Sequence, residues 1–150
     1  MGKRREGREA ALQFLYQLDL SDQPPAELFA DFWKLRANPG QQQTPTKTRV
    51  FAEQLASGVF AHRAAIDEQI VKYAANYSLE RIAAVDRNIL RMGIYEMLFC
   101  PDVPPVVSIN EAIEIAKKFG SEESGRFING ILDRVRGELS RSPRQAEPLA

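Results

Sequence analysis

Apolar residues recur every three to four positions along most of the chain, which is the spacing of helices that bury one face. No segment alternates apolar and polar residues over the length of a strand, so the pattern predicts a protein made of helices. It predicts a first helix over residues 4–18 and a second over residues 26–36, with a turn between them. The side chains expected to be buried in these two helices are Ala11, Phe14, Leu15, Leu18, Leu28, Phe29, Phe32 and Trp33.

The middle of the chain combines a loop with a long apolar stripe. Residues 37–46 contain proline, glycine and three glutamines, which predicts a loop. From residue 47 to residue 73 apolar side chains keep helical spacing, which predicts one long helix. His62 lies on this stripe, where a packed core histidine is the expected role. Residues 76–78 interrupt the pattern, so we expect the boundary between two helical halves there, with Ser78 capping a short turn.

Two further helices are predicted in the second half of the chain. Residues 83–99 carry apolar side chains on two faces, which is typical of a central helix, and Gly93 allows a neighbouring helix to approach. The next helix has two competing start signals, the Pro104–Pro105 pair and the capping box that Ser108 opens. We favour the earlier start, because Val106 then joins the buried stripe.

The last predicted helix follows Gly120, which we expect to end the preceding helix in the left-handed conformation. Ser121 is the expected cap, and acidic residues follow it where the helix dipole favours negative charge. Residues 140–150 are polar and broken by prolines, which predicts a disordered tail. The expected fold class is therefore all-α with about seven helices, divided into an N-terminal subdomain (1–77) and a C-terminal subdomain (78–139).

Composition excludes several classes of protein. Twenty basic and twenty acidic side chains cancel, so any affinity for nucleic acid must come from a local patch. Cys100 is the only cysteine and His62 the only histidine, so no internal disulfide and no Cys/His metal cluster can form. No apolar run is long enough to span a membrane, and the N-terminus lacks the apolar core of a signal peptide. We therefore expect a cytoplasmic protein with no membrane partner.

Candidate catalytic chemistry is sparse. An enzyme needs a nucleophile, a tuned acid/base pair, a metal or a cofactor cradle, and no recognisable set of such residues is present. Cys100 follows Phe99 at a predicted helix end, where it is expected to pack as a small hydrophobe. We expect a protein that is not an enzyme and has no catalytic residue, cofactor or metal.

The start of the chain carries a local basic patch. Four cationic side chains stand against one carboxylate, which gives the first eight side chains a net charge of +3. At 100° per residue, Tyr16 falls within about 20° of Arg5 on the first helix, so phosphate contacts and base stacking can share one strip. The alternatives are a solvated helix start and a Tyr16 that edges the core beside Leu12. The basic residues are Lys3, Arg4, Arg5 and Arg8.

A second unusual position lies on the last helix. Phe127 sits about 90° from the centre of its helix's buried stripe, between charged residues. A large aromatic side chain outside the apolar face suits a protein contact. The alternative is that a neighbouring helix covers it.

Three segments of the sequence closely resemble the NusB transcription antitermination family. They are RREGREAALQFLYQLDL over residues 4–20, RIAAVDRNILRMGIYEML over 81–98 and SINEAIEIAKKFGSEESGRFINGILD over 108–133. The resemblance runs in order and spans nearly the whole chain apart from the 37–46 loop and the tail. It implies two small helical bundles packed roughly crosswise.

The resemblance also implies a function. Proteins of this family bind boxA sequences in nascent ribosomal-RNA leaders together with NusE, a small-subunit ribosomal protein. The pair then joins the RNA polymerase antitermination complex and helps the polymerase read through terminators. Some members of the family are monomers and some pair through the RNA-binding face, so the resemblance leaves a homodimer open.

By position, the resemblance assigns roles to two groups of residues. Arg4, Arg5, Arg8 and Tyr16, with the neighbouring Lys3, match the family's RNA-facing helix. Asp86 matches an acidic position beside the RNA and partner surfaces, while Glu123, Ser124 and Phe127 match the face that receives NusE. Glu6 and Gly7 interrupt what is often a denser arginine cluster, so we expect weak RNA binding alone and tighter binding with NusE.

Two rival interpretations belong to other classes. A NusB-like domain also occurs at the front of ribosomal-RNA cytosine methyltransferases, but the sequence holds no glycine-rich cofactor strand and no catalytic Pro-Cys pair in that setting. The other rival is a structural protein whose apolar surface seals a homodimer. Light scattering with and without boxA RNA distinguishes that protein from an RNA-binding adaptor.

Overall fold

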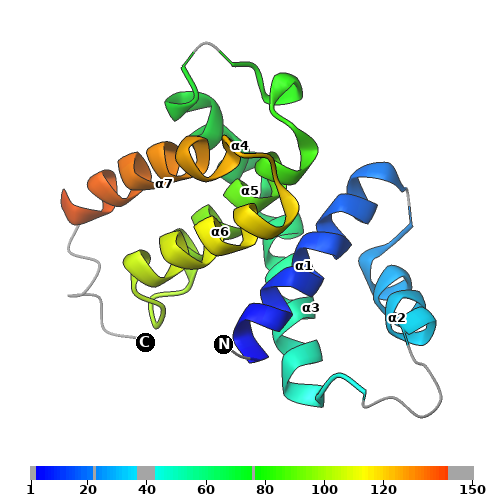
Figure 1. The fold of residues 1–150 in the computed structure, drawn as a ribbon. Helices are drawn as coiled ribbons and strands as arrows, with labels where there is room; N and C mark the ends of the chain where they lie inside the picture. The colour runs from blue at the N-terminus through cyan, green and yellow to red at the C-terminus, as the bar shows by residue number, and fades with distance from the viewer. Residues whose placement is uncertain (1–2, 22, 37–42, 76, 142–150) are drawn as a thin grey trace. The chain divides into compact units, whose positions relative to one another are not determined.

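The computed structural model describes residues 3–21, 23–36, 43–75 and 77–141. Within these residues the backbone forms seven α-helices and one 3-10 turn and no strand, which confirms the all-α fold (Figure 1). The elements are α1 (Lys3–Leu20), α2 (Pro25–Arg36), α3 (Thr46–Ala61), α4 (Arg63–Tyr73), η1 (Leu79–Arg81), α5 (Ala84–Phe99), α6 (Pro105–Phe119) and α7 (Ser124–Arg141).

The helices gather into two compact units, Met1–Ala61 and His62–Ala150. This division falls at residues 61–62 and not at the expected 77–78. The helix expected over 47–73 is in fact two helices, α3 and α4, with His62 between them. Val59 and Ile66 are both fully buried on either side of the break. Because the buried stripe keeps its register across the break, the apolar pattern alone does not reveal it.

His62 is not a core residue, contrary to expectation. It is exposed at the start of α4, and its ring stacks on Phe99 with the centroids 4.1 Å apart and the planes 23° apart. Tyr95 lies in the same stack, 6.1 Å from His62. The backbone of His62 leaves the helical range, with φ −109° and ψ 19°, so the helical stripe does not predict where its side chain lies.

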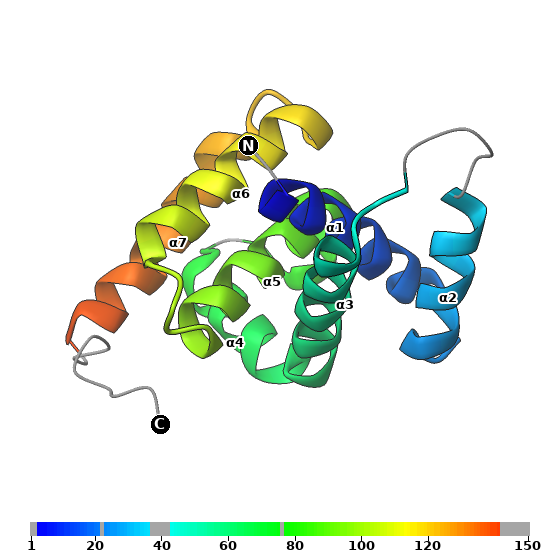
Figure 2. The same ribbon diagram turned by 90° about the horizontal axis from the view of Figure 1, so that it is seen from below.

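The first unit is built on the close approach of α1 and α3, which lie side by side in both views (Figure 1, Figure 2). Small side chains line the approach, and Ala11, Ala52 and Ala56 have no exposed surface. Phe14 joins α1 to α2, because its ring contacts Phe29, Phe32 and Trp33 at centroid distances of 4.6, 4.2 and 5.5 Å. The Trp33 indole also donates a 2.7 Å hydrogen bond to Glu53 of α3.

The second unit is built around α5, which packs against α4, α6 and α7. Both of its predicted apolar faces contribute fully buried side chains, so its central position is confirmed. Gly93 has the predicted role, since a Cβ there would lie 3.0 Å from Leu132 of α7. The hydrogen bond that Lys72 of α4 donates to Glu138 of α7 raises the pKa of Lys72.

Two polar links fix α5 to its neighbours. The Arg91 guanidinium donates to both carboxylate oxygens of Asp67 on α4, at 2.8 and 3.1 Å, and to Asn88 at 3.0 Å. Glu96 is 3% exposed and accepts a 2.7 Å hydrogen bond from Ser108 of α6. Ser108 is therefore a buried bridging residue and not a helix cap, and the earlier start of α6 at Pro105 is confirmed.

Several expected helix-end details are wrong. Val106 is 49% exposed and lies off the buried stripe of α6. Gly120 has φ −98°, which is not left-handed. The last helix begins at Ser124 and not directly after Ser121. The Ser124 hydroxyl accepts the backbone N–H of Ser121 at 2.9 Å across the turn that precedes the helix. Ser78 precedes η1 without a side-chain cap hydrogen bond.

Two expectations fall mainly outside the described residues. These are most of the 37–46 loop and the tail from residue 142 onward, while α7 itself continues to Arg141. Among the described residues, no helix combines the length and the apolar character needed to cross a membrane.

Candidate functional site

The first turns of α1 carry the basic patch. Lys3 and Arg4 are exposed, Arg5 is half-buried and Tyr16 is 45% exposed. The ring of Tyr16 is therefore accessible and does not merely edge the core. Tyr16 follows Arg5 by eleven positions, so the two side chains lie on one side of α1 about 16 Å apart along its axis.

Arg8 differs from the expected exposed phosphate clamp, because it is only 5% exposed. It precedes Ala11, Leu12 and Leu15 by three, four and seven positions, which places it on the buried face of α1. Its guanidinium lies over the ring of Phe51 on α3, 5.5 Å from the centroid. A direct contact between Arg8 and RNA is therefore not supported by this geometry.

Arg4 contacts the same ring. Its guanidinium carbon lies 4.7 Å from the Phe51 centroid. Gly7 lies between the two arginines and is buried, and a Cβ at Gly7 would stand 2.5 Å from the Phe51 ring. The absence of a side chain at this position therefore brings Phe51 against α1.

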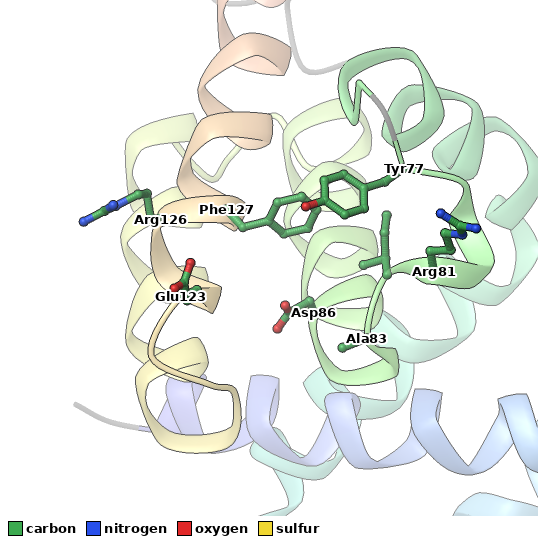
Figure 3. A pocket seen from close by; sticks show the side chains of 8 residues that line it. Tyr77, Arg81, Ala83, Asp86, Glu123, Arg126 and Phe127 are labelled. Carbon is green, nitrogen blue, oxygen red and sulfur yellow. The ribbon is translucent and has the colours of Figure 1, made fainter.

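The second unit contains a pocket of about 310 Å³ formed where three segments meet (Figure 3). One wall comes from the segment between α4 and α5, one from the first turn of α5, and one from the start of α7. Its lining includes Tyr77, Arg81, Asp86, Glu123, Arg126 and Phe127.

Aromatic rings form one side of the pocket. Phe127 is half-buried and meets the Tyr77 ring edge to face, with centroids 5.6 Å apart and planes at 73°. Tyr77 is 52% exposed. No helix fully covers Phe127, so its accessible edge lies on the pocket wall beside a second exposed ring. Such a pair suits the insertion of an apolar side chain.

Two carboxylates also line the pocket. Asp86 is half-buried at the start of α5, and Glu123 is exposed before α7. In Figure 3 Asp86 lies below the two rings, between Glu123 and Ala83. An apolar surface bordered by two carboxylates complements a segment with an apolar residue next to a basic one.

Arg87 holds the pocket wall that the segment between α4 and α5 forms. Its guanidinium donates to the backbone carbonyls of Leu79 and Ile82, at 3.3 and 3.4 Å. These bonds tie η1 to α5 and so fix the segment from which Arg81 and Ile82 line the pocket.

Ser124 does not share this surface. It is 2% exposed, and its hydroxyl bonds to Ser121. It precedes Ile128 and Ile131 by four and seven positions, which places it on the buried face of α7. Its side chain shapes the start of the helix and is not available to a partner.

The structure thus brings Asp86, Glu123 and Phe127 together in the second unit, while the basic residues and Tyr16 occupy the first. Sequence reasoning missed Tyr77, Arg81 and Arg126 of the pocket and Phe51 beneath the arginines. Tyr77 and Arg81 lie outside the long α-helices, where periodicity carries no information about neighbours. Among the described residues, no group of three His, Cys, Asp or Glu could hold a metal ion.

The chain is similar to known proteins over most of its length. The chain is 45% identical to the transcription antitermination protein NusB of Myxococcus xanthus (strain DK1622) over 141 residues, which are 94% of this chain and 99% of that protein. It is 47% identical to the NusB of Trichlorobacter lovleyi over 147 residues, 98% and 96% of the two chains.

Solved structures give the same result. T. maritima NusB superposes with a TM-score of 0.75 at 38% identity, over 90% of this chain and 91% of that one. A crystal structure of the antitermination factors NusB and NusE in complex with dsRNA matches with a TM-score of 0.77 at 28% identity, over 92% and 98% of the two chains. The model of the NusB family matches residues 5–136, and the chain therefore belongs to the NusB family.

Proposed function

We propose that this chain is a transcription antitermination factor. It binds boxA RNA of nascent ribosomal-RNA leaders together with NusE, and it helps RNA polymerase read through terminators. The observation that carries this proposal is the presence of two chemically different surfaces, one basic and aromatic, the other apolar and acidic, in a chain that belongs to the NusB family. Transcription occurs in the bacterial cytoplasm, so the protein acts there.

The RNA contact is assigned to α1. Lys3, Arg4 and Arg5 supply cations for phosphates, and Tyr16 supplies a ring on which a base stacks. The solved relative holds double-stranded RNA. The exposed Tyr16 ring supports a single strand here, because an unpaired base offers its face for stacking. The chain has no net charge, so binding depends on this local patch and weakens as salt rises.

The protein contact is assigned to the pocket of the second unit. Phe127 and Tyr77 receive an apolar side chain of NusE, and Asp86 and Glu123 pair with a basic residue beside it. Asp86 also matches an acidic position beside RNA, but its place among these residues favours the protein partner.

The mechanism needs no covalent step. The protein works as an adaptor that holds RNA and NusE at once, and it is not an enzyme. The similarity to the Myxococcus xanthus antitermination protein covers 99% of that protein, which supports the adaptor function.

A gel shift with a boxA oligonucleotide tests the proposal. The protein alone should bind weakly, and the protein with NusE should bind more tightly, because NusE adds contacts to the same strand. Raising the salt concentration should weaken both complexes. A scrambled RNA of equal length and a boxA duplex are the controls. Equal affinity for boxA and scrambled RNA, with or without NusE, would contradict the proposal.

A further inference from the structure

Phe51 occupies an unusual position for a large aromatic residue on a buried stripe. It is half-buried, and α1 passes beside it at Gly7, the one position in this turn without a side chain. The guanidinium groups of Arg4 and Arg8 both lie over its ring, at 4.7 and 5.5 Å from the centroid. One ring of α3 thus contacts two cations of α1.

The two arginines differ in what they offer to solvent. Arg8 is 5% exposed, whereas Arg4 is exposed. A guanidinium above an aromatic ring is attracted to the negative face of the ring. The N–H groups of the guanidinium lie in the guanidinium plane and remain able to donate hydrogen bonds. Arg4 can therefore contact the Phe51 ring and donate to a phosphate at the same time.

We propose that Phe51 is a positioning residue of the RNA surface, which holds the Arg4 guanidinium in an orientation that favours phosphate binding. This inference rests on the proposed RNA binding by α1. An unsupported arginine side chain at a helix start samples many rotamers, and binding to RNA then has to restrict them. The Phe51 ring restricts the Arg4 side chain before RNA binds. The buried Arg8 guanidinium also contacts this ring and helps to hold it in place.

A double-mutant cycle tests the inference through the affinity for single-stranded boxA RNA. The variants are Arg4→Ala, Phe51→Leu and the double variant. We expect Phe51→Leu to weaken RNA binding by about two- to five-fold, the range of an exposed cation–π contact. In the Arg4→Ala background the same change should have no further effect, because the residue that Phe51 positions is gone. Phe51→Tyr keeps the ring and should keep the affinity.

Controls separate positioning from folding. Phe60→Leu makes the same change nine residues further along α3, about 180° around the helix, and should leave RNA affinity unchanged. Circular dichroism and thermal melting establish that each variant is folded. If Phe51→Leu is not folded, Phe51→Met replaces it in the cycle, because the flexible methionine side chain fills irregular gaps. NusE binding to the second unit should be unchanged in every variant.

Two results would overturn the inference even where Phe51→Leu weakens RNA binding. One is an additive cycle, in which Phe51→Leu weakens binding equally with and without Arg4. The other is a Phe51→Tyr variant as weak as Phe51→Leu. If Arg4→Ala weakens RNA binding but Phe51→Leu does not, the inference fails and the proposed function stands. If the unaltered protein binds boxA RNA neither alone nor together with NusE, both fail.

Discussion

Gly7 shows how one missing side chain shapes the RNA surface. The sequence alone indicates only that it interrupts a run of arginines. In the structure it is buried, and the Phe51 ring occupies the space that a Cβ would take. Gly7 takes a position that could hold another arginine, and it leaves room for the Phe51 ring that Arg4 and Arg8 contact.

Replacing Gly7 by alanine should destabilise the protein. Alanine favours the helix by about 1 kcal/mol, but the new Cβ would lie 2.5 Å from the Phe51 ring. Overpacking of this kind costs about 1–3 kcal/mol, so the clash outweighs the helix gain. Thermal melting should show a lower midpoint.

The matched control is Gly130→Ala on α7, where no atom lies within 4 Å of the new Cβ. Here only the helix gain applies, so the midpoint should rise by the equivalent of up to about 1 kcal/mol. Changes of the same sign in both variants would contradict the proposed packing at Gly7.

Part of this detail was available from the sequence. Phe127 stood out because it lies off its helix's stripe. Arg8 and Ser124 lie on the buried faces of their helices, so their burial could have been predicted from spacing alone. The contacts of Phe51 with Arg4 and of Tyr77 with Phe127 join distant parts of the sequence. Periodicity does not report such neighbours.

At the scale of elements, the apolar pattern predicted α1, α2, α5 and α6 with small errors at their ends. It failed between α3 and α4, because the stripe stays in register through His62. It also placed the start of α7 directly after Ser121, whereas a turn over residues 121–124 precedes the helix. Helix ends depend on local hydrogen bonds that a hydrophobic pattern does not contain.

The ion pair between α4 and α5 gives a prediction at this scale. In Asp67→Ala the Arg91 side chain, which is 7% exposed in the unaltered protein, loses both oxygens of its partner. Breaking a buried pair costs about 3–5 kcal/mol, and the 18% exposure of Asp67 favours the lower end. Urea unfolding should therefore show a loss of about 3 kcal/mol.

Asp133→Ala is the matched control for this ion pair. Its partner Arg136 lies on the same helix. The Arg136 side chain is 47% exposed and the Asp133 side chain is 54% exposed. Surface pairs of this kind contribute less than about 1 kcal/mol. A loss in Asp67→Ala no larger than in Asp133→Ala would show that the link between α4 and α5 is not structural.

At the scale of the whole molecule, each compact unit carries its own surface. The first holds the exposed cations of α1, and the second holds the pocket around Phe127. The resemblance to the NusB family led to the function more directly than the residues alone. Composition and periodicity indicated a helical protein with a basic patch, but they do not identify boxA RNA or NusE.

The central claim is that these two surfaces bind two different macromolecules, each through its own residues. Arg4→Glu tests the first surface, because Arg8 is buried and its reversal would disturb the fold. Phe127→Asp tests the second, since it places a charge on the aromatic wall of the pocket. Both side chains retain solvent exposure, so both variants should fold.

The most direct measurement is an anisotropy titration of labelled boxA RNA with the protein and both variants, each with and without NusE. Phe127→Asp should bind RNA as the unaltered protein does, but NusE should no longer tighten the complex. Arg4→Glu should bind RNA weakly with and without NusE. The slope of the logarithm of its RNA affinity against the logarithm of the salt concentration should be smaller by about one unit. The account is contradicted if NusE tightens RNA binding by Phe127→Asp in full, or if Arg4→Glu binds RNA as the unaltered protein does.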